Sequence, residues 1–448
     1  MKVRSLKIQS FRNIDDLSLE FDRRLTVFLG VNGSGKSTIL DAIAGLLNCL
    51  PMLLRVPTIS VQYNSSELQT RRNRLNLRKP ANELLRFLNN SSDSQDLEFN
   101  IKNGSNNFSN TIIVESSESD IEWSLTKTID SGYVKKNHEW DGLINLVSKI
   151  KSGLEKSNQT NIALFTYYST GRMVSALARA PLGFHMSPLN AMDDPLNKSG
   201  EIFMLFFHWF RYLEDLENEE RRDRPSYRNH QLSSIRNAIP QFLTGFSDLR
   251  IRRSPYLRMT ISKDGEELII NQLSDGEKCL LAMVGDLARR LSIANPGLED
   301  PLKGEGVVLI DELELHLHPQ WQRGVISKLL ETFPNCQFII STHSPQIISD
   351  VKPENIYVLK SVDDKITATH PHSSFGRDSN QILETVMGVS ARPEVIKNQL
   401  NDLFRLIDEG KIEEAKVLKS TLSDEIGLDE PQFSKANVLI RRQEILGR

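Results

Sequence analysis

Nine consecutive residues near the N-terminus combine the types and spacing that bind phosphate: Gly30-Val31-Asn32-Gly33-Ser34-Gly35-Lys36-Ser37-Thr38. A short apolar run, 25–29, precedes them, and a pattern typical of a helix follows from Ile39. In the order strand, glycine-rich loop and helix, consecutive backbone N–H groups can turn toward one centre and hold the phosphates of a nucleotide. Lys36 can then reach the β- and γ-phosphate oxygens, and the Ser37 hydroxyl can bind Mg²⁺. The motif predicts a site for a nucleoside triphosphate in preference to a chance glycine-rich turn.

Two adjacent carboxylates, Asp311 and Glu312, follow the apolar run 306–310. A buried parallel strand has no need of acids at its end unless they serve a ligand at that edge of the sheet, where α/β proteins bind their ligands. Asp311 is suited to hold Mg²⁺, directly or through water, and Glu312 to orient or deprotonate the attacking water. The alternative is a pair of exposed acids at a strand end, which the phosphate loop makes less favoured.

Two further features have both a structural and a chemical interpretation. Ser274 and Glu277 are spaced as the capping box of a helix over 279–293, but a serine hydroxyl at a helix N-terminus also suits an anion. His343 follows the apolar run 336–340 and can donate to a γ-phosphate. A histidine considered alone, however, is more often a core residue whose hydrogen bonds are satisfied within the protein.

Composition sets the broad class of protein. The chain has 448 residues, enough for two or three domains, and a formal charge of −3, which argues neither for nor against nucleic-acid binding. Its three cysteines, Cys49, Cys279 and Cys336, are far apart, as in a reduced cytosolic protein. No window approaches the roughly 20 apolar residues of a membrane helix. We therefore expect a soluble, cytoplasmic protein with no membrane partner.

Periodicity and turn residues predict the order of the elements. Strands are expected at 3–9, 17–21, 25–29, 97–102, 111–115, 120–128 and 161–167, with a hairpin of 256–262 and 267–271. Helices are expected at 139–157, 201–223, 279–293, 320–332, 392–409, 411–425 and 431–445. The arginine-rich stretch 221–237 is interpreted as exposed or mobile.

The five motifs together resemble those of ABC-type ATPases, in the branch that contains RecF, SMC and OLD proteins. They are the Walker A motif 30–37, the signature 273–277, the Walker B motif 307–312, and the segments 313–319 and 341–344. The resemblance implies an α/β fold, with an ABC-type ATPase head built from 1–60 and 245–375. It also implies an inserted mixed α/β lobe at 61–244 and a C-terminal helical extension at 376–448.

In that family two heads pack head to tail, with two ATP molecules between them. The resemblance implies ATP-binding residues Arg12, Asn13, Asn32, Gly33, Ser34, Gly35, Lys36, Ser37 and Thr38, with Ser37 and Asp311 holding Mg²⁺. It implies catalytic roles for Glu312 and His343, and a signature acting in trans through Ser274, Gly276 and Glu277. It also implies that 313–319 contacts the opposing head, which we favour over a metal site at Glu314, His316 and His318.

The signature departs from the transporter form, with Asp275 in place of Gly and Glu277 in place of Gln. The glutamine that follows the phosphate loop in this family is unassigned, and Gln62 is a weak candidate for it.

The insertion, the stretch 167–172 and the tail together resemble the ATPase subunit of the Septu anti-phage defence system. This resemblance implies a multimeric ATPase that holds and regulates a separate HNH nuclease, with DNA contacted through the complex. One alternative is a RecF-like repair clamp that binds duplex DNA through basic residues in 64–80 and 221–237. Another is a nucleotide-sensing scaffold with little turnover.

Overall fold

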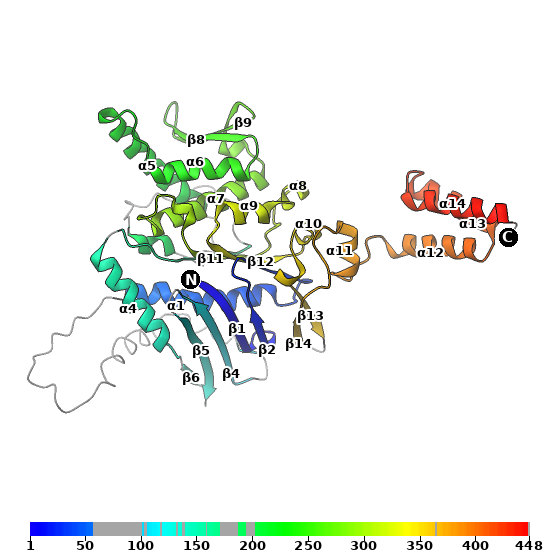
Figure 1. The fold of residues 1–448 in the computed structure, drawn as a ribbon, viewed down its shortest axis with the longest axis horizontal. Helices are drawn as coiled ribbons and strands as arrows, with labels where there is room; N and C mark the ends of the chain where they lie inside the picture. Colours follow the sequence, from blue (N-terminus) through cyan, green and yellow to red (C-terminus); the bar gives the residue numbers. More distant parts are fainter. Residues whose placement is uncertain are drawn as a thin grey trace, which may run out of the picture. The chain divides into compact units, whose positions relative to one another are not determined.

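The computed structural model describes residues 1–56, 101–102, 105–116, 119–130, 133–136, 139–157, 159–170, 187–193, 202–362 and 365–446. These residues form two compact units, Met1–Arg377 and Asp378–Arg448 (Figure 1). The predicted strand residues 97–100, the basic stretch 64–80, Gln62 and residues 171–172 lie outside the described part of the chain.

A six-stranded sheet forms the centre of the first unit, in the order β14-β13-β3-β12-β11-β7. Its strands are Lys365–Thr369, Ile356–Val362, Leu25–Leu29, Cys336–Thr342, Gly306–Ile310 and Leu164–Tyr168 in that order. All pairs are parallel except β13 with β14. Every residue of β3, β11 and β12 is buried, because both faces of the sheet are covered.

The register of this sheet brings the ends of four strands to one edge. Val27 of β3 is opposite Ile340 of β12, Ile340 is opposite Ile310 of β11, and Ile310 is opposite Tyr168 of β7. The segments that follow these strands therefore emerge side by side. They are the phosphate loop, His343, the acid pair, and the residues after Tyr168.

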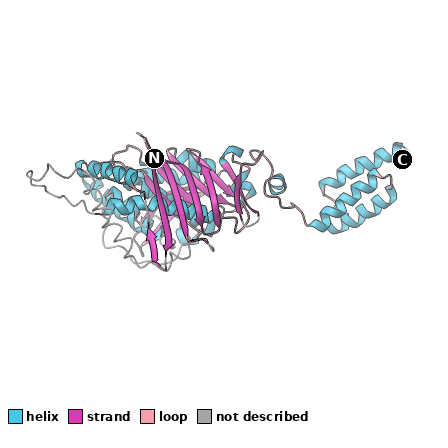
Figure 2. Cartoon of the chain, turned by 90° about the horizontal axis from the view of Figure 1, so that it is seen from below, coloured by secondary structure: helices cyan, strands magenta, loops and turns pink. Residues whose placement is uncertain are grey.

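Helix α1, Lys36–Arg55, lies between this sheet and a second, antiparallel one, with the strand order β2-β1-β4-β5-β6 (Figure 1). The strands are Ile14–Glu20, Lys2–Phe11, Asn107–Glu115, Asp120–Asp130 and Tyr133–Lys136 in that order, and Figure 2 looks onto them. Trp123 of β5 ties the layers together through a 2.9 Å hydrogen bond from its indole N–H to the carbonyl of Leu46.

Because α1 is covered on two sides, it is apolar over most of its surface. Contrary to the prediction that no window approaches such a length, in the described part of the chain it is the single helix long and apolar enough to cross a membrane by length and composition. This is weak evidence for a membrane segment, since 67% of its apolar window is buried inside the protein.

Helix α7, Asp275–Ala294, is almost completely buried beneath a lobe of helices and short strands (Figure 1). The lobe consists of α5 Ile202–Asp223, α6 His230–Phe242, β8 Phe246–Arg252, β9 Arg258–Lys263 and β10 Glu266–Ile269. Among its described residues, the first unit also contains the α-helices α4 Asp141–Lys156, α8 Pro319–Gln322, α9 Val325–Thr332 and α10 Pro345–Ile348.

Two element predictions were wrong. The stretch 221–237 includes the first half of α6, which Asn229 caps and which buries Leu232 and Ile235. Its apolar residues have helical spacing, but the arginine-rich composition around them hides the pattern. The predicted helix 320–332 is two helices, because Gly324 at φ 77° breaks it.

The inserted segment 61–244 supplies strands to both large sheets. Strands β4 and β5 extend the antiparallel sheet beyond β1, and β7 pairs with β11 in the parallel sheet. The boundary of a separate lobe at 61–244 stays a prediction, but parts of this segment belong to the core of the first unit.

The second unit contains α11 Ser379–Thr385 and three longer helices, α12 Glu394–Asp408, α13 Ile412–Ile426 and α14 Pro431–Leu446. The three predicted helical patterns are confirmed to within a few residues. Their apolar faces meet in a small core of their own, made by Leu400, Leu403, Ile407, Ala415, Leu422, Phe433, Ala436 and Ile440.

Candidate active site

The phosphate loop turns sharply before helix α1 because Gly33 and Gly35 have φ angles of 79° and 95°. The Lys36 ammonium folds back over the loop and donates to the carbonyls of Gly30 at 2.9 Å and Val31 at 3.1 Å. Burial lowers the pKa of Lys36, and the nearby carboxylates of Asp311, Glu312 and Glu314 oppose that shift.

Two further features of the loop suit an anion, a buried hydroxyl group without a partner among the described residues and several solvent-exposed residues. The buried hydroxyl of Ser34 has no hydrogen-bond partner among the described residues, so the loop holds a potential donor that none of them satisfies. Asn32, Gly33 and Ser37 are exposed and Thr38 is half-buried. These features fit the binding of phosphate and of the Mg²⁺ that accompanies it.

The acid pair is held in place by Ser341 of the neighbouring strand β12. The Ser341 hydroxyl donates to the buried carboxylate of Asp311 and accepts the backbone N–H of Glu312 at 2.8 Å. Glu312 itself has a left-handed backbone, with φ 49°. One hydroxyl therefore holds the carboxylate of Asp311 and the backbone of Glu312, a role that the sequence analysis did not assign to Ser341.

Glu314 and His343 lie next to this pair. Glu314 accepts hydrogen bonds from the backbone N–H of His343 and from the Thr342 hydroxyl, the latter at 2.7 Å. Burial lowers the pKa of His343, and the Lys36 ammonium lowers it further. The structure thus brings His343 near Lys36 and the acids, as its predicted role requires.

The turn between β1 and β2 lies on the phosphate loop. The Asn13 amide donates to the carbonyl of Gly33 at 3.3 Å and accepts from the Thr38 hydroxyl at 3.1 Å. Arg12 forms an ion pair of 2.6 Å with Asp41 of α1. The structure therefore places Arg12 and Asn13 at the loop.

Tyr167 adds a further support that sequence reasoning missed. Its hydroxyl lies near Asp41, and burial together with the charges of Asp41 and Asp311 raises the pKa of Tyr167. The missing signal was topological, because only strand pairing shows that β7 lies beside the Walker B strand.

The same pairing shows which polar groups follow β7. The backbone N–H of Asp311 donates to the carbonyl of Tyr168 at 2.9 Å, so the chain leaves β7 next to the acid pair. Ser169, which is buried, and Thr170 come next. These two hydroxyl residues follow β7 in the chain, whereas the weak candidate Gln62 lies outside the described residues.

The signature residues form a second site. Ser274 caps α7. Gly276 leaves no room for a side chain, because a Cβ atom at this position would lie 2.5 Å from the carbonyl oxygen of His316. A cleft of about 760 Å³ here is lined by Lys263, Ser274, Gly276, Glu277, His316, Leu317, His318, Gln320 and Trp321. No residue of the loop 30–38 lines it.

The segment after Glu312 divides between these two sites. Glu314 faces β12, whereas His316 and His318 line the signature cleft. In the part of the chain that the structure describes, no three His, Cys, Asp or Glu side chains converge as a metal site.

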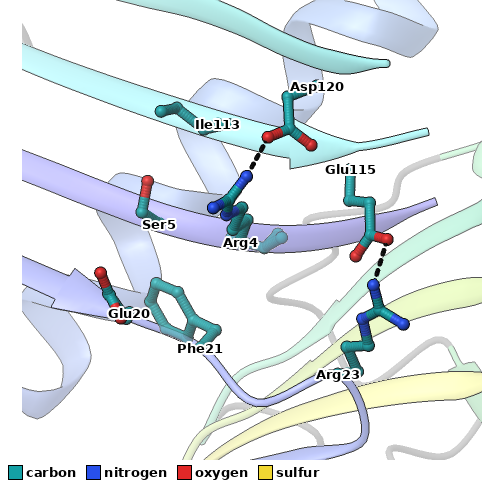
Figure 3. Close-up of a pocket in the computed structure, with 9 residues that line it drawn as sticks. Arg4, Ser5, Glu20, Phe21, Arg23, Ile113, Glu115 and Asp120 are labelled. Carbon is teal, nitrogen blue, oxygen red and sulfur yellow. Dashed lines mark hydrogen bonds and ion pairs between the residues drawn. The ribbon is translucent and has the colours of Figure 1, made fainter. Parts of the chain in front are cut away.

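Another concave surface lies on the antiparallel sheet, away from these motifs. Both of its arginines are paired with acids, Arg4 with Asp120 and Arg23 with Glu115, the latter at 2.5 Å, and a third acid, Glu20, also lines it (Figure 3). Its two cations are therefore already neutralised, and none of its lining residues belongs to a nucleotide motif.

Comparison with known proteins agrees with the motifs. The family described as "AAA domain, putative AbiEii toxin, Type IV TA system" matches residues 25–349. The "Retron Vc95 probable ATPase" of Vibrio cholerae serotype O1 biovar El Tor is 29% identical, over 90% of this chain and 82% of its own length. The "Septu protein PtuA" of Bacillus thuringiensis is 23% identical, over 91% of this chain and 89% of its own length.

Among solved structures, the SMC head domain from Thermotoga maritima is similar with a TM-score of 0.44 and 14% identity, covering 83% of this chain and 99% of that chain. The family match spans well over half of the chain. The chain therefore belongs to this AAA-domain family and is an ATPase.

Proposed function

We propose that two copies of this chain pack head to tail, with ATP held between the phosphate loop of one copy and the signature cleft of the other. One observation carries the proposal. The cleft at Ser274 and Gly276 lies at the N-terminus of α7, a position that favours an anion, but it shares no lining residue with the loop 30–38. A second copy completes both sites at once.

Each group has a role that its position supports. Lys36 and the loop N–H groups hold the phosphates, with Arg12 and Asn13 beside them, and Ser37 and Asp311 are suited to hold Mg²⁺, which neutralises phosphate charge when bound. Glu312, oriented by Ser341, positions the attacking water. His343 donates to the γ-phosphate from the same copy. Ser274 and Gly276 contact it from the partner, and Glu277 acts in trans as part of the same signature.

The setting we propose is anti-phage defence in the cytoplasm. The relatives named as a retron ATPase and a Septu protein align along most of this chain and most of their own lengths. We propose that nucleotide state controls a separate HNH nuclease held by the complex, and that DNA is contacted through that complex. The tail, with its own core, is the segment we assign to partner binding.

The variant Glu312→Gln tests the ATPase mechanism. It keeps the shape of the side chain but removes the carboxylate, so turnover should fall by about 100-fold or more while ATP remains bound. Light scattering should then show an ATP-dependent dimer or larger assembly that persists. The matched control is Glu299→Gln, an exposed acid. Unchanged turnover in Glu312→Gln, or a monomer at saturating ATP, would contradict the proposal.

Co-expression with the neighbouring open reading frame tests the partner. Co-elution of a nuclease, together with protection of cells against phage, supports the defence complex. A lone chain that binds duplex DNA, with affinity falling steeply as salt rises, indicates the RecF-like clamp instead. A chain that binds ATP without measurable hydrolysis indicates the sensing scaffold.

A further inference from the structure

The signature carries a carboxylate where a polyanion is expected to dock. Glu277 is the third residue of α7, and its side chain is only 7% exposed. A buried charge is poorly screened by water, so it repels an approaching triphosphate more strongly than a surface acid does. The site can accept a phosphate only if this charge is balanced from within the protein.

Lys263 is the residue that balances it. The ammonium lies 2.8 Å from Oε1 of Glu277 and 5.4 Å from the centroid of the Phe246 ring. Lys263 comes from the last position of β9, on a different element from Glu277, and it lines the same cleft as Ser274. The ion pair lowers the pKa of Glu277 against the effect of burial and raises the pKa of Lys263.

The same carboxylate also holds Ser274. Its Oε2 accepts the backbone N–H of Ser274 at 2.8 Å and the Ser274 hydroxyl at 2.9 Å. The hydroxyl proton is therefore directed at Glu277, and a phosphate must compete with Glu277 for it. By drawing negative charge toward Oε1, Lys263 weakens Glu277 as a competitor for that proton.

We propose that Lys263 is a positioning residue for ATP bound by the second copy. It neutralises Glu277, so that the signature accepts a triphosphate and the Ser274 hydroxyl can turn to it. This inference rests on the proposed head-to-tail assembly and adds to it the residue that makes an acidic signature compatible with an anion.

A second pair at the signature provides a matched control. Lys278 forms a 2.9 Å ion pair with Asp275, whose side chain is 79% exposed. Removing Lys278 changes the formal charge of the chain as much as removing Lys263 does. Solvent screens the Asp275 carboxylate, however, so the loss of its Lys278 partner should have little effect on the binding of a triphosphate at the signature.

The experiment measures the ATP concentration that gives half-maximal self-association, in the Glu312→Gln background to prevent hydrolysis. Lys263→Met should raise this concentration about tenfold, because it leaves Glu277 buried and unpaired beside the anion. Lys263→Arg should restore the parent value, and Lys278→Met should change it by less than about twofold. ATP binding by dilute, unassociated chains should be the same in all variants.

A double-mutant comparison separates charge neutralisation from a purely structural tie. If Lys263 acts by neutralising Glu277, adding Lys263→Met to Glu277→Gln changes the half-maximal concentration by less than about twofold. Glu277→Gln alone must then raise the half-maximal ATP concentration much less than Lys263→Met alone does. If the two single variants raise the half-maximal ATP concentration equally, the ion pair only fastens the hairpin of β9 and β10 to α7. That result overturns the inference.

The two levels of failure are distinguishable. If the Glu312→Gln parent does not associate with ATP at all, the proposed assembly is wrong. If the parent associates and Lys263→Met behaves like it, the assembly stands and the role of Lys263 is wrong.

Discussion

The Tyr168 hydroxyl donates a 3.0 Å hydrogen bond to Asp286, a fully buried carboxylate on α7. Its neighbour Tyr167 lies near Asp41 on α1. Successive residues of a strand point to opposite faces of a sheet. The end of β7 therefore fastens the phosphate-loop helix on one face and the signature helix on the other.

Tyr168→Phe should reduce stability modestly. Asp286 keeps its ion pairs with Arg289 at 2.6 Å and Arg290 at 2.7 Å, so the variant loses one buried hydrogen bond, about 1 kcal/mol of the free energy of unfolding. Urea unfolding measures this loss, with Tyr256→Phe as the control because Tyr256 is 59% exposed.

Asp286→Ala should be much more damaging than Tyr168→Phe. It leaves the buried guanidinium groups of Arg289 and Arg290 without their carboxylate, at a cost of about 3 to 5 kcal/mol. Equal effects of the two variants in urea would contradict the view that Asp286 is the centre of this network.

Ser341→Ala should slow hydrolysis while leaving ATP binding intact. The variant removes the one hydroxyl that bonds both Asp311 and the backbone of Glu312, so the two acids lose their common support. We expect kcat to fall by about 10- to 100-fold, and the affinity for ATP, measured by fluorescence, to change little. Ser349→Ala, in the turn after α10, is the control, and an undiminished kcat would show that the acids are held by other contacts.

His343 should titrate below its ordinary pKa of 6.5, since burial and Lys36 both favour the neutral ring. The unfolded chain then takes up this proton first as pH falls. The stability contributed by His343 is therefore full above pH 6.5 and decreases below it, until the folded pKa is reached. Binding of ATP should raise the midpoint, because a nearby polyanion stabilises the imidazolium.

NMR of the imidazole nitrogens checks this titration, with His343→Gln to assign the signal. A midpoint at or above 6.5 without nucleotide would contradict the burial and the nearness of Lys36 that the structure shows.

Leu403→Ala should loosen the tail without changing ATP binding. Leu403 is fully buried among the apolar side chains of α12, α13 and α14, so its truncation should cost about 2 to 5 kcal/mol within that unit. Hydrogen exchange of residues 394–446 in the full chain should rise, while residues 25–55 remain protected. Val417→Ala, at a position 68% exposed, should leave exchange unchanged.

The sequence alone determined the chemistry of the site. The phosphate loop, the acid pair and the capped helix at Ser274 are local patterns, in which a few neighbouring residues specify both a backbone geometry and a function. Buried parallel strands such as β11 and β12 were also readable, because strands covered on both faces are continuously apolar.

Only the tertiary structure decided which distant groups support that chemistry. Ser341 beneath the acids, Tyr167 beside Asp41 and Lys263 on Glu277 each depend on how one element packs against another, which brings together residues that are not neighbours in the chain. Neither periodicity nor local propensity encodes these pairings, because each side chain reads locally as an ordinary strand residue. Packing of the whole sheet places them at one site.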